Sequence, residues 1–273
     1  MNNHLPISIS KTFEKLRQNN KKALMPYLTA GYPDEKTFIK LLKEIINAGA
    51  DMVEIGIPFS DPLADGKTIQ SSSQIALQNG TNLDGIFRQL GEFENRYKVP
   101  LIIMSYYNPV LQYGISKFLK KSKTTGGFGL LIPDMIPDEG KTIEKKCFDA
   151  GIDLIYLLAP TSSVQRRRLI LKRSRGFIYL VSVAGVTGAR KNLPDNLNRW
   201  IVQAKKESEL PVCVGFGISD LPQAKSVARV ADGVIIGSAI IDIIKKSSDS
   251  RRAVSNVGRF IGKIRKGMDN VKS

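Results

Sequence analysis

The chain has 273 residues, of which 42% are hydrophobic, and a formal net charge of +16. This length fits one large α/β domain or two smaller ones, and it is ample for a substantial core. Every apolar run is far shorter than the roughly 20 residues that a membrane span needs, and residues 1–22 lack the apolar core of a signal peptide. We therefore expect a cytoplasmic protein with no membrane partner.

The chain is poor in histidine and cysteine. His4 is the only histidine, which argues against a Ser-His-Asp triad, a histidine-based zinc site or a histidine general base. Cys147 and Cys213 lie in apolar or helical surroundings, so we expect two buried free thiols and no metal site. Proton transfer must then fall to carboxylates, lysine, tyrosine or water.

The positive charge comes from 41 basic and 25 acidic residues. Such an excess is compatible with nucleic acid, an anionic substrate or an acidic partner. The basic clusters at 21–22, 166–173 and 251–272 fall mostly where solvated helix faces are expected, and the chain has no zinc-finger, RNA-recognition or homeodomain signature. We expect a basic surface without a nucleic-acid partner.

After a short amphipathic helix at 9–18, apolar strands alternate with amphipathic helices. Asp34, Ser219 and either Ser162 or Ser163 are the expected N-caps. Eight strands are predicted, at 24–29, 52–57, 101–105, 129–132, 154–159, 177–182, 212–215 and 233–236. The helices are predicted at 35–48, 84–97, 115–123, 139–150, 163–173, 197–209, 222–230, 239–245 and 251–266.

Strands separated by helices pair in parallel through right-handed crossovers. Eight such units without a change of composition predict a single (β/α)8 TIM barrel over residues 1–273, with an extra N-terminal helix. A doubly wound open sheet is the alternative. Catalytic groups of a barrel come from the ends of the strands and the loops that follow them, which draws attention to polar residues at those positions.

The most informative stretch is 51–70. Glu54 lies in an apolar run typical of a strand buried on both faces, where an isolated carboxylate is costly unless it has a task. The alternative is a solvated or lysine-paired glutamate without a chemical role. The loop after the strand carries Asp61 and Asp65, and its prolines and glycines indicate a shaped loop above the strand end.

Two glycine-bearing segments, 214–219 and 236–239, follow the last two predicted strands. Glycines allow close backbone approach, and amides at a helix N-terminus bind a dianion, so Gly217, Gly237 and Ser238 predict a phosphate site. The segment 182–190 is also glycine-rich and contains Thr187. It is interpreted either as a lid over a substrate or as an ordinary turn.

Taken together, these motifs resemble the tryptophan synthase α-chain family. The resemblance rests on residues 54–66, with 185–188 and 215–218, and extends from 25–31 to 237–240. It implies retro-aldol cleavage of indole-3-glycerol phosphate to indole and glyceraldehyde 3-phosphate, without a cofactor in this chain. It also implies that Glu54 is the general acid and base, and that Asp65 holds the indole N–H and stabilises positive charge on the ring.

The same resemblance implies the substrate-binding residues. Thr187 belongs to them, the phosphate would lie on amides around Gly188, Gly217, Gly237 and Ser238, and the aromatic residues Tyr27, Tyr106, Tyr179 and Phe216 would line the indole pocket or its edge.

The resemblance further implies a pyridoxal-phosphate β subunit that receives indole through a tunnel in an α2β2 heterotetramer. The expected contacts include Pro58, Asp61 and Asp134. The chain departs from the family pattern at Lys67, where proline is usual, and at residues 134–137, where Asp-Met-Ile-Pro replaces Asp-Leu-Pro. Lys67 keeps open the alternative of a regulatory and docking subunit that has weak cleavage activity of its own.

Overall fold

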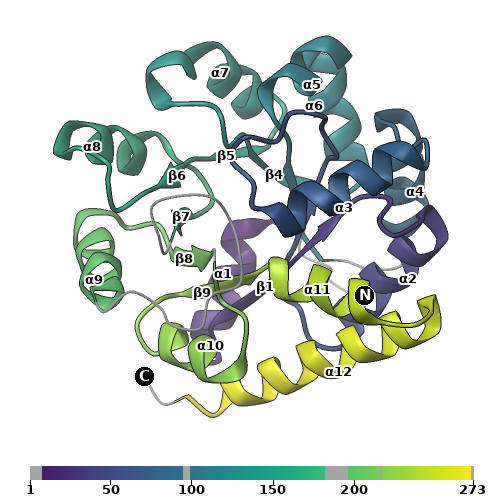
Figure 1. Ribbon diagram of the computed structural model, residues 1–273. Coiled ribbons are helices and arrows are strands. Elements are labelled where there is room, and N and C mark those ends of the chain that lie inside the picture. Colours follow the sequence, from purple (N-terminus) through teal and green to yellow (C-terminus); the bar gives the residue numbers. More distant parts are fainter. Residues whose placement is uncertain (1–7, 95–98, 182–195, 216, 272–273) are drawn as a thin grey trace, which may run out of the picture.

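The computed structural model describes residues 8–94, 99–181, 196–215 and 217–271, which form a barrel of parallel strands inside a ring of helices (Figure 1). Neighbouring strands follow the order β5-β4-β3-β2-β1-β9-β8-β7-β6, and every pair is parallel. The strands are β1 (Ala23–Thr29), β2 (Val53–Gly56), β3 (Leu101–Met104), β4 (Gly127–Leu131), β5 (Asp153–Ile155), β6 (Leu157–Leu158), β7 (Ile178–Val181), β8 (Val212–Gly215) and β9 (Gly233–Ile236).

The predicted barrel is confirmed, with one difference in its fifth strand. That strand is divided at Tyr156 into β5, which pairs with β4, and β6, which pairs with β7. Tyr156 is buried, and its hydroxyl donates to Glu144 Oε1 in the helix layer at 2.7 Å. The side chain is therefore held by a helix, and the two short strands on either side of it close the sheet.

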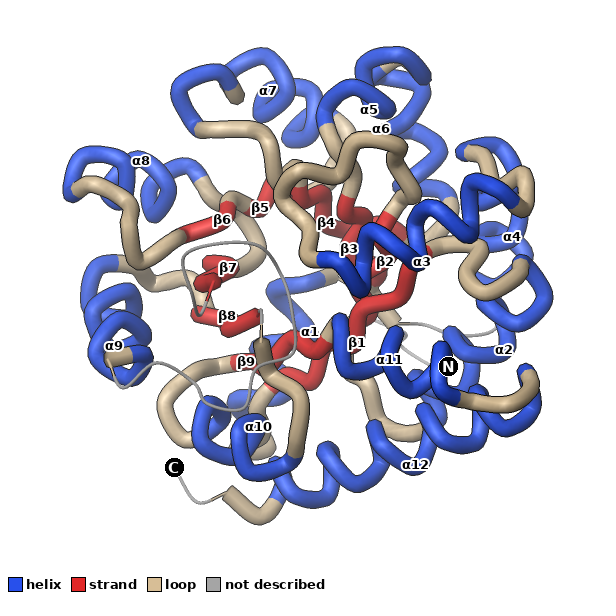
Figure 2. The backbone as a smooth tube through the Cα atoms, in the orientation of Figure 1, coloured by secondary structure: helices blue, strands red, loops and turns tan. Residues whose placement is uncertain are grey.

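The helices surround the strands as a second layer (Figure 2). In the described residues they are α1 (Ile9–Gln18), α2 (Glu35–Asn47), α3 (Lys67–Gln78), α4 (Leu83–Glu94), α5 (Tyr107–Tyr113), α6 (Ile115–Thr124), α7 (Lys141–Asp149), α8 (Val164–Arg173), α9 (Leu197–Glu207), α10 (Leu221–Ala228), α11 (Ser238–Lys246) and α12 (Ser250–Asp269), with a short 3-10 turn, η1 (Pro137–Glu139). None of these described helices combines the length and apolarity needed to cross a bilayer.

Two predicted N-caps are confirmed and one is wrong. Asp34 accepts from Thr37 N at the start of α2, and Ser163 accepts from Arg166 N at the start of α8. At the start of α10 the cap is Asp220 instead of Ser219, because the Asp220 side chain accepts from Gln223 N. The side-chain oxygen of Gln223 accepts from Ser219 N at 2.8 Å. The Asp220 carboxylate and the Gln223 side-chain amide therefore each accept from one backbone N–H at the start of the helix.

Helix α1 closes the amino-terminal end of the barrel. Its apolar side chains Ile9, Phe13 and Leu16 are buried, and the rings of Phe13 and Phe177 lie 6.1 Å apart. Ile9 also packs against Gly129 of β4, where the absence of a side chain leaves room for it. The predicted extra helix thus completes the core at the end opposite the strand termini that carry the site.

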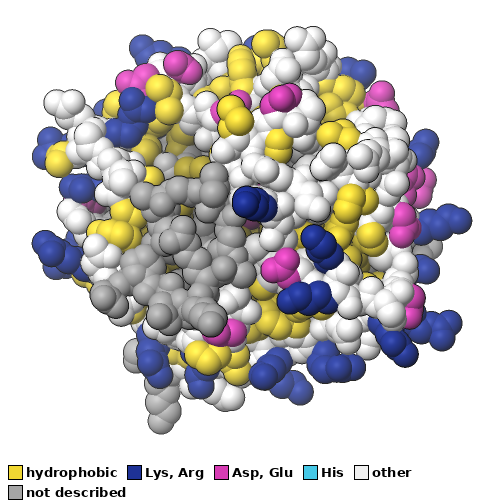
Figure 3. All heavy atoms as spheres, viewed as in Figure 1, with side chains coloured by type: hydrophobic (Ala, Val, Ile, Leu, Met, Phe, Trp, Pro, Cys, Tyr) yellow, Lys and Arg dark blue, Asp and Glu magenta, His cyan; other side chains and the backbone are white. Residues whose placement is uncertain are grey.

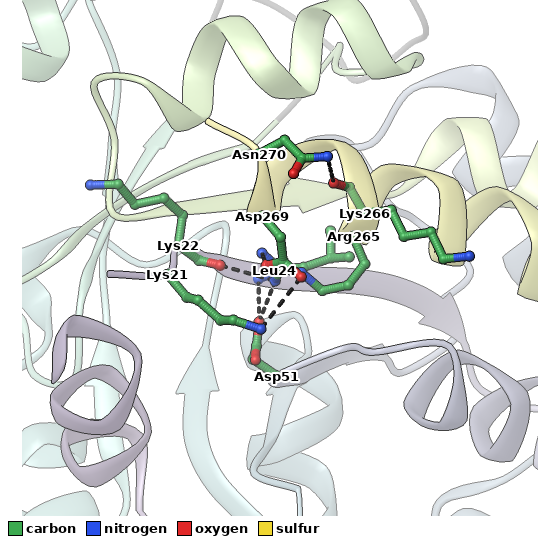
Figure 4. A network of polar contacts seen from close by, with 8 residues as sticks. All are labelled: Lys21, Lys22, Leu24, Asp51, Arg265, Lys266, Asp269 and Asn270. Carbon is green, nitrogen blue, oxygen red and sulfur yellow. Dashed lines mark hydrogen bonds and ion pairs between the residues drawn. The ribbon is translucent and has the colours of Figure 1, made fainter. Parts of the chain in front are cut away.

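A buried ion-pair network fastens α12 to the same end (Figure 4). Arg265 Nη1 donates to Asp51 Oδ2 at 2.9 Å and to Lys22 O at 3.0 Å, and its Nη2 lies 2.7 Å from Asp269 Oδ1. Asp51 also accepts from Leu24 N at 2.8 Å. One guanidinium therefore joins the last helix to the beginnings of β1 and β2.

Candidate active site

Glu54 is a buried carboxylate in the second strand of the barrel. It lies in β2 opposite Tyr27 of β1 and Ile102 of β3, and its side chain is 1% exposed. Burial raises the pKa of Glu54 to about 8, the negative charge of Asp65 acts in the same direction, and the Tyr179 hydroxyl, which donates to Oε2 at 3.4 Å, opposes them. Glu54 is therefore mostly protonated at neutral pH.

Asp65 is the second buried carboxylate, at the end of the loop between β2 and α3. The Tyr106 hydroxyl donates to its Oδ2 at 3.1 Å and accepts from Ala64 N at 2.9 Å. The side-chain amide of Gln70 donates to the Asp65 carbonyl at 2.8 Å. Burial raises the pKa of Asp65 to about 6, and the Tyr106 hydrogen bond opposes the rise, so Asp65 is mostly ionised at neutral pH.

The two carboxyl groups therefore have different protonation states in one site. A protonated group can give a proton to a substrate atom, and an ionised group beside it can stabilise developing positive charge. The tyrosines around the pair are themselves buried, and burial raises the pKa of Tyr27 and of Tyr179. These phenols act as neutral hydrogen-bonding groups.

One cavity collects most of the predicted site residues. Glu54 and Asp65 line it together with Tyr27 and Tyr179. The remaining lining residues are Ile69, Met104, Gly217, Ile235, Gly237 and Ser238. Tyr106 reaches the site through its hydrogen bond to Asp65, whereas Thr187, Gly188 and Phe216 lie outside the described residues.

Two of the tyrosines require glycine beside them. A Cβ at Gly56 of β2 would overlap the Tyr27 hydroxyl, and a Cβ at Gly215 of β8 would lie 2.5 Å from the Tyr179 hydroxyl. Side chains of parallel strands stand close to those of their neighbours on the same face, so only a glycine leaves space for a phenol between strands. These glycines thereby determine how far each ring extends into the barrel.

Three other residues of the cavity have the features predicted for an anion site. Gly217 has a φ of +88°, which favours glycine, and Gly237 is the N-cap residue of α11. Ser238 is the first residue of α11, and the first turn of that helix contains no acidic side chain. Backbone donors and the positive end of the helix dipole are thus available to a negatively charged group.

The residues predicted to contact a partner lie in different environments. Pro58 is buried, while Asp61 and Asp134 are exposed. The Asp134 carboxylate accepts from Tyr107 N at 3.0 Å and so supports the first turn of α5, next to Tyr106. On the face shown in Figure 3, lysine and arginine side chains are scattered and do not merge into one continuous patch.

Lys67 is exposed and begins α3 directly after its N-cap residue, Gly66. Proline is well tolerated at this first helical position because the backbone N–H there has no helical partner. Among the ion pairs of the described residues none joins Lys67 to Asp65, and burial and Tyr106 are the causes of the pKa shift of Asp65. In the described residues, the side chain of Lys67 therefore forms no ion pair with the Asp65 carboxylate.

Several residues of the site were not predicted. Ile69, Met104 and Ile235 line the cavity, and Thr29 and Ser72 form hydrogen bonds behind Tyr27. Thr29 follows Tyr27 by two residues and therefore faces the same side of β1, which is a signal that alternation in the sequence could have supplied. Ser72 lies in α3, a helix that the sequence analysis did not predict.

The described residues contain no cluster of three His, Cys, Asp or Glu that could hold a metal ion.

A parallel barrel with two buried carboxylates in a cavity at the carboxyl ends of its strands, and with glycine turns after its last two strands, is typical of a barrel enzyme. The profile of the family "Tryptophan synthase alpha chain" matches residues 13–269. The chain belongs to this family, and it is the lyase subunit of the tryptophan synthase complex, in tryptophan biosynthesis.

Individual relatives agree over nearly the full length. The tryptophan synthase alpha chain of Dehalococcoides mccartyi is 42% identical over 261 residues, covering 96% of this chain and 99% of the relative. That of Geotalea uraniireducens is 42% identical over 96% of this chain and 98% of the relative. The alpha subunit of Legionella pneumophila has a TM-score of 0.89 at 35% identity over 96% of this chain and 98% of its own. A chain of Mycobacterium tuberculosis tryptophan synthase has a TM-score of 0.87 at 32% identity, covering 95% of this chain and 97% of its own.

Proposed function

We propose that this chain cleaves indole-3-glycerol phosphate to indole and glyceraldehyde 3-phosphate, with Glu54 as the acid and base and Asp65 as the electrostatic partner. The observation that carries the proposal is the buried pair of carboxyl groups in one cavity, with Tyr179 donating to Glu54 and Tyr106 donating to Asp65; burial raises the pKa of Glu54 to about 8 and that of Asp65 to about 6. The two environments suit the two roles that the reaction requires.

The reaction can proceed with no net consumption of protons. Protonated Glu54 gives its proton to C3 of the indole ring, which leaves positive charge on the ring nitrogen. The resulting Glu54 carboxylate takes the proton from the hydroxyl on the adjacent side-chain carbon. A carbonyl forms there, the carbon–carbon bond breaks, and its electrons restore the aromatic ring. Glu54 ends protonated, as it began.

Asp65 would act while the ring is positively charged. Its ionised carboxylate, oriented by Tyr106 at 3.1 Å, would accept the indole N–H and stabilise the cation. Glu54 and Asp65 are 1% and 4% exposed in a cavity also lined by Tyr27, Tyr179 and apolar side chains, and exclusion of water would strengthen this attraction. In the same cavity, Gly217, Gly237 and Ser238 would bind the phosphate through backbone amides and a hydroxyl.

We propose that the whole chain works as one barrel domain with a β subunit in an α2β2 assembly. The solved Mycobacterium tuberculosis structures are of tryptophan synthase, which supports a β partner. The exposed Leu63 and Ile136, 84% and 38% accessible, lie in loops with Asp61 and Asp134 and offer an apolar surface for it. Pyridoxal phosphate in that partner, the absence of a cofactor here and a cytoplasmic location remain predictions.

A steady-state assay of cleavage tests the proposal. Glu54→Gln keeps the shape of the side chain but cannot exchange the proton, so turnover should fall by at least about a thousandfold while β binding is retained. Full activity of this variant would assign the acid and base to another group. Wild type without turnover in the complex with the β subunit would instead favour the regulatory and docking role.

A further inference from the structure

A chain of three buried hydroxyl groups lies behind the cavity. Tyr27 Oη is 3.3 Å from Thr29 Oγ1, and Thr29 Oγ1 is 2.6 Å from Ser72 Oγ. Ser72 Oγ lies 2.8 Å from the Ile69 carbonyl. Thr29 and Ser72 are each 1% exposed and Tyr27 is 6% exposed, so the chain is shielded from solvent.

The direction of these hydrogen bonds follows from counting protons. A carbonyl only accepts, so Ser72 uses its single hydroxyl proton on Ile69. Ser72 must then accept from Thr29, and Thr29, having given its one proton to Ser72, must accept from Tyr27. The phenol proton of Tyr27 is therefore directed toward Thr29.

Tyr27 lines the same cavity as the acid–base pair and lies opposite Glu54 in the neighbouring strand. Asp65 and Glu54 both act electrostatically on Tyr27, yet no hydrogen bond joins Tyr27 to either carboxylate in the described residues. Gly56 lies beside the Tyr27 hydroxyl, and because glycine has no Cβ it leaves space around that hydroxyl. A phenol proton released from Thr29 could therefore turn toward a carboxylate.

We propose that Thr29 and Ser72 are positioning residues of the lyase site, which hold the phenol proton of Tyr27 away from Glu54 and Asp65. This inference rests on the roles proposed above for the two carboxylates. A donor turned toward a carboxylate stabilises its ionised form and makes it a weaker base. The hydroxyl chain prevents that, and it also joins α3, which begins two residues after Asp65, to the wall of the barrel at β1.

The other groups facing the carboxylates are already engaged. Tyr179 of β7 donates to Glu54, Tyr106 donates to Asp65, and the negative charge of Asp65 acts on Glu54. On the far side of α3, Thr68 donates to Asp242 of α11 at 3.4 Å. Tyr27 is thus the neighbouring phenol whose proton is not shared with a carboxylate.

Substitutions along the chain separate this role from a packing role. Thr29→Val has nearly the same shape but no hydroxyl, so it frees the phenol proton, whereas Thr29→Ser retains the hydroxyl and serves as the matched control. Ser72→Ala removes the acceptor of Thr29, whose proton then turns to the Tyr27 oxygen and releases the phenol proton in the same way. Tyr27→Phe, alone and combined with Thr29→Val, removes the proton itself.

Two measurements on the full chain are needed: the pH profile of kcat/KM for cleavage in the presence of the β subunit, and the titration of the Glu54 and Asp65 carboxyl carbons by carbon-13 NMR without substrate. In Thr29→Val and Ser72→Ala we expect one carboxyl titration, and the matching limb of the profile, to move to lower pH by about one unit. Thr29→Ser should titrate as wild type does. In the Tyr27→Phe background, Thr29→Val should produce no further shift.

A shift that persists without the Tyr27 hydroxyl would overturn the proposal, as would unchanged titrations in folded Thr29→Val and Ser72→Ala. The NMR titration does not require turnover. If wild type failed to cleave the substrate while the carboxyl shifts occurred, the proposed function would fail and the hydroxyl chain would stand; the converse result would reject the hydroxyl chain alone.

Discussion

Tyr106→Phe should make cleavage depend on pH in a new way. The substitution keeps the ring, which packs against Phe59 at 5.2 Å between centroids, but removes the donor to Asp65 and the acceptor of Ala64 N. A hydrogen bond to an ionised carboxylate contributes about 1.5 kcal/mol, which corresponds to about one pKa unit. The pKa of Asp65 should therefore rise from about 6 to about 7.

The size of the effect follows from the ionised fraction of Asp65. At pH 6 this fraction falls from about one half to about one tenth, at pH 7 from about nine tenths to about one half, and at pH 8 it hardly changes. We expect kcat/KM to be lowered about fivefold at pH 6, about twofold at pH 7 and little at pH 8, beyond any constant loss caused by the unpaired Ala64 amide.

The assay is the steady-state rate of indole formation across this pH range in the presence of the β subunit. Tyr113→Phe is the matched control, because it removes a phenol that donates to a different carboxylate, Asp84, away from the cavity. A loss of equal size at every pH would refute the reasoning. The loss would then not come from a change in the ionised fraction of Asp65, and the Tyr106 hydrogen bond would not set the pKa that governs cleavage.

Three further predictions concern stability. Burial raises the pKa of Glu54 from 4.5 to about 8, so the stabilisation of the folded state by the protonated carboxyl is full below pH 4.5 and is lost as the pH rises through 8. At pH 9 the free energy of unfolding of Glu54→Gln, measured in urea, should therefore exceed that of wild type by a few kcal/mol. At pH 5 the two free energies should be nearly equal. Arg265→Lys should lower the free energy of unfolding in urea by about 3 kcal/mol without changing kcat. Arg252→Lys, at an exposed arginine of the same helix, is the control and should leave the free energy of unfolding unchanged. Equal losses in the two variants would contradict a special role for the buried network. Gly140→Ala should cost about 2 kcal/mol because the new Cβ overlaps the Tyr156 hydroxyl, while Gly262→Ala, with nothing within 4 Å, should not lower the melting temperature.

The barrel could be predicted because its strands are continuous apolar runs and its helices are amphipathic. Helix α3 could not, because its buried face contains Ser72, Ser73 and Ala76 beside one large apolar side chain, Ile69. Small and polar residues on a buried face produce little hydrophobic periodicity. Helix α5 was missed for a related reason, since it has seven residues and only Val110 is buried.

Site residues could be predicted where their residue type is unusual for the local sequence pattern. Glu54 stood out as a carboxylate in an apolar strand, and the glycines after the last two strands stood out as breaks in a regular pattern. Thr29 and Ser72 fit their local sequence without conflict. Their importance depends on the three-dimensional distance between a strand and a helix 43 residues apart, which spacing in the sequence does not contain.

The division of the fifth strand at Tyr156 also separates both carboxylates from the proposed phosphate-binding residues, although Tyr179 of β7 donates to Glu54 from beyond this point. Glu54, Asp65 and Tyr106 precede this point in the chain, and Gly217, Gly237 and Ser238 follow it. With the proposed roles, a bound substrate would span two half-barrels, its ring on the first and its phosphate on the second. The intact substrate would then connect the two halves covalently, and cleavage would remove this connection. Indole would remain in contact with the first half and glyceraldehyde 3-phosphate with the second.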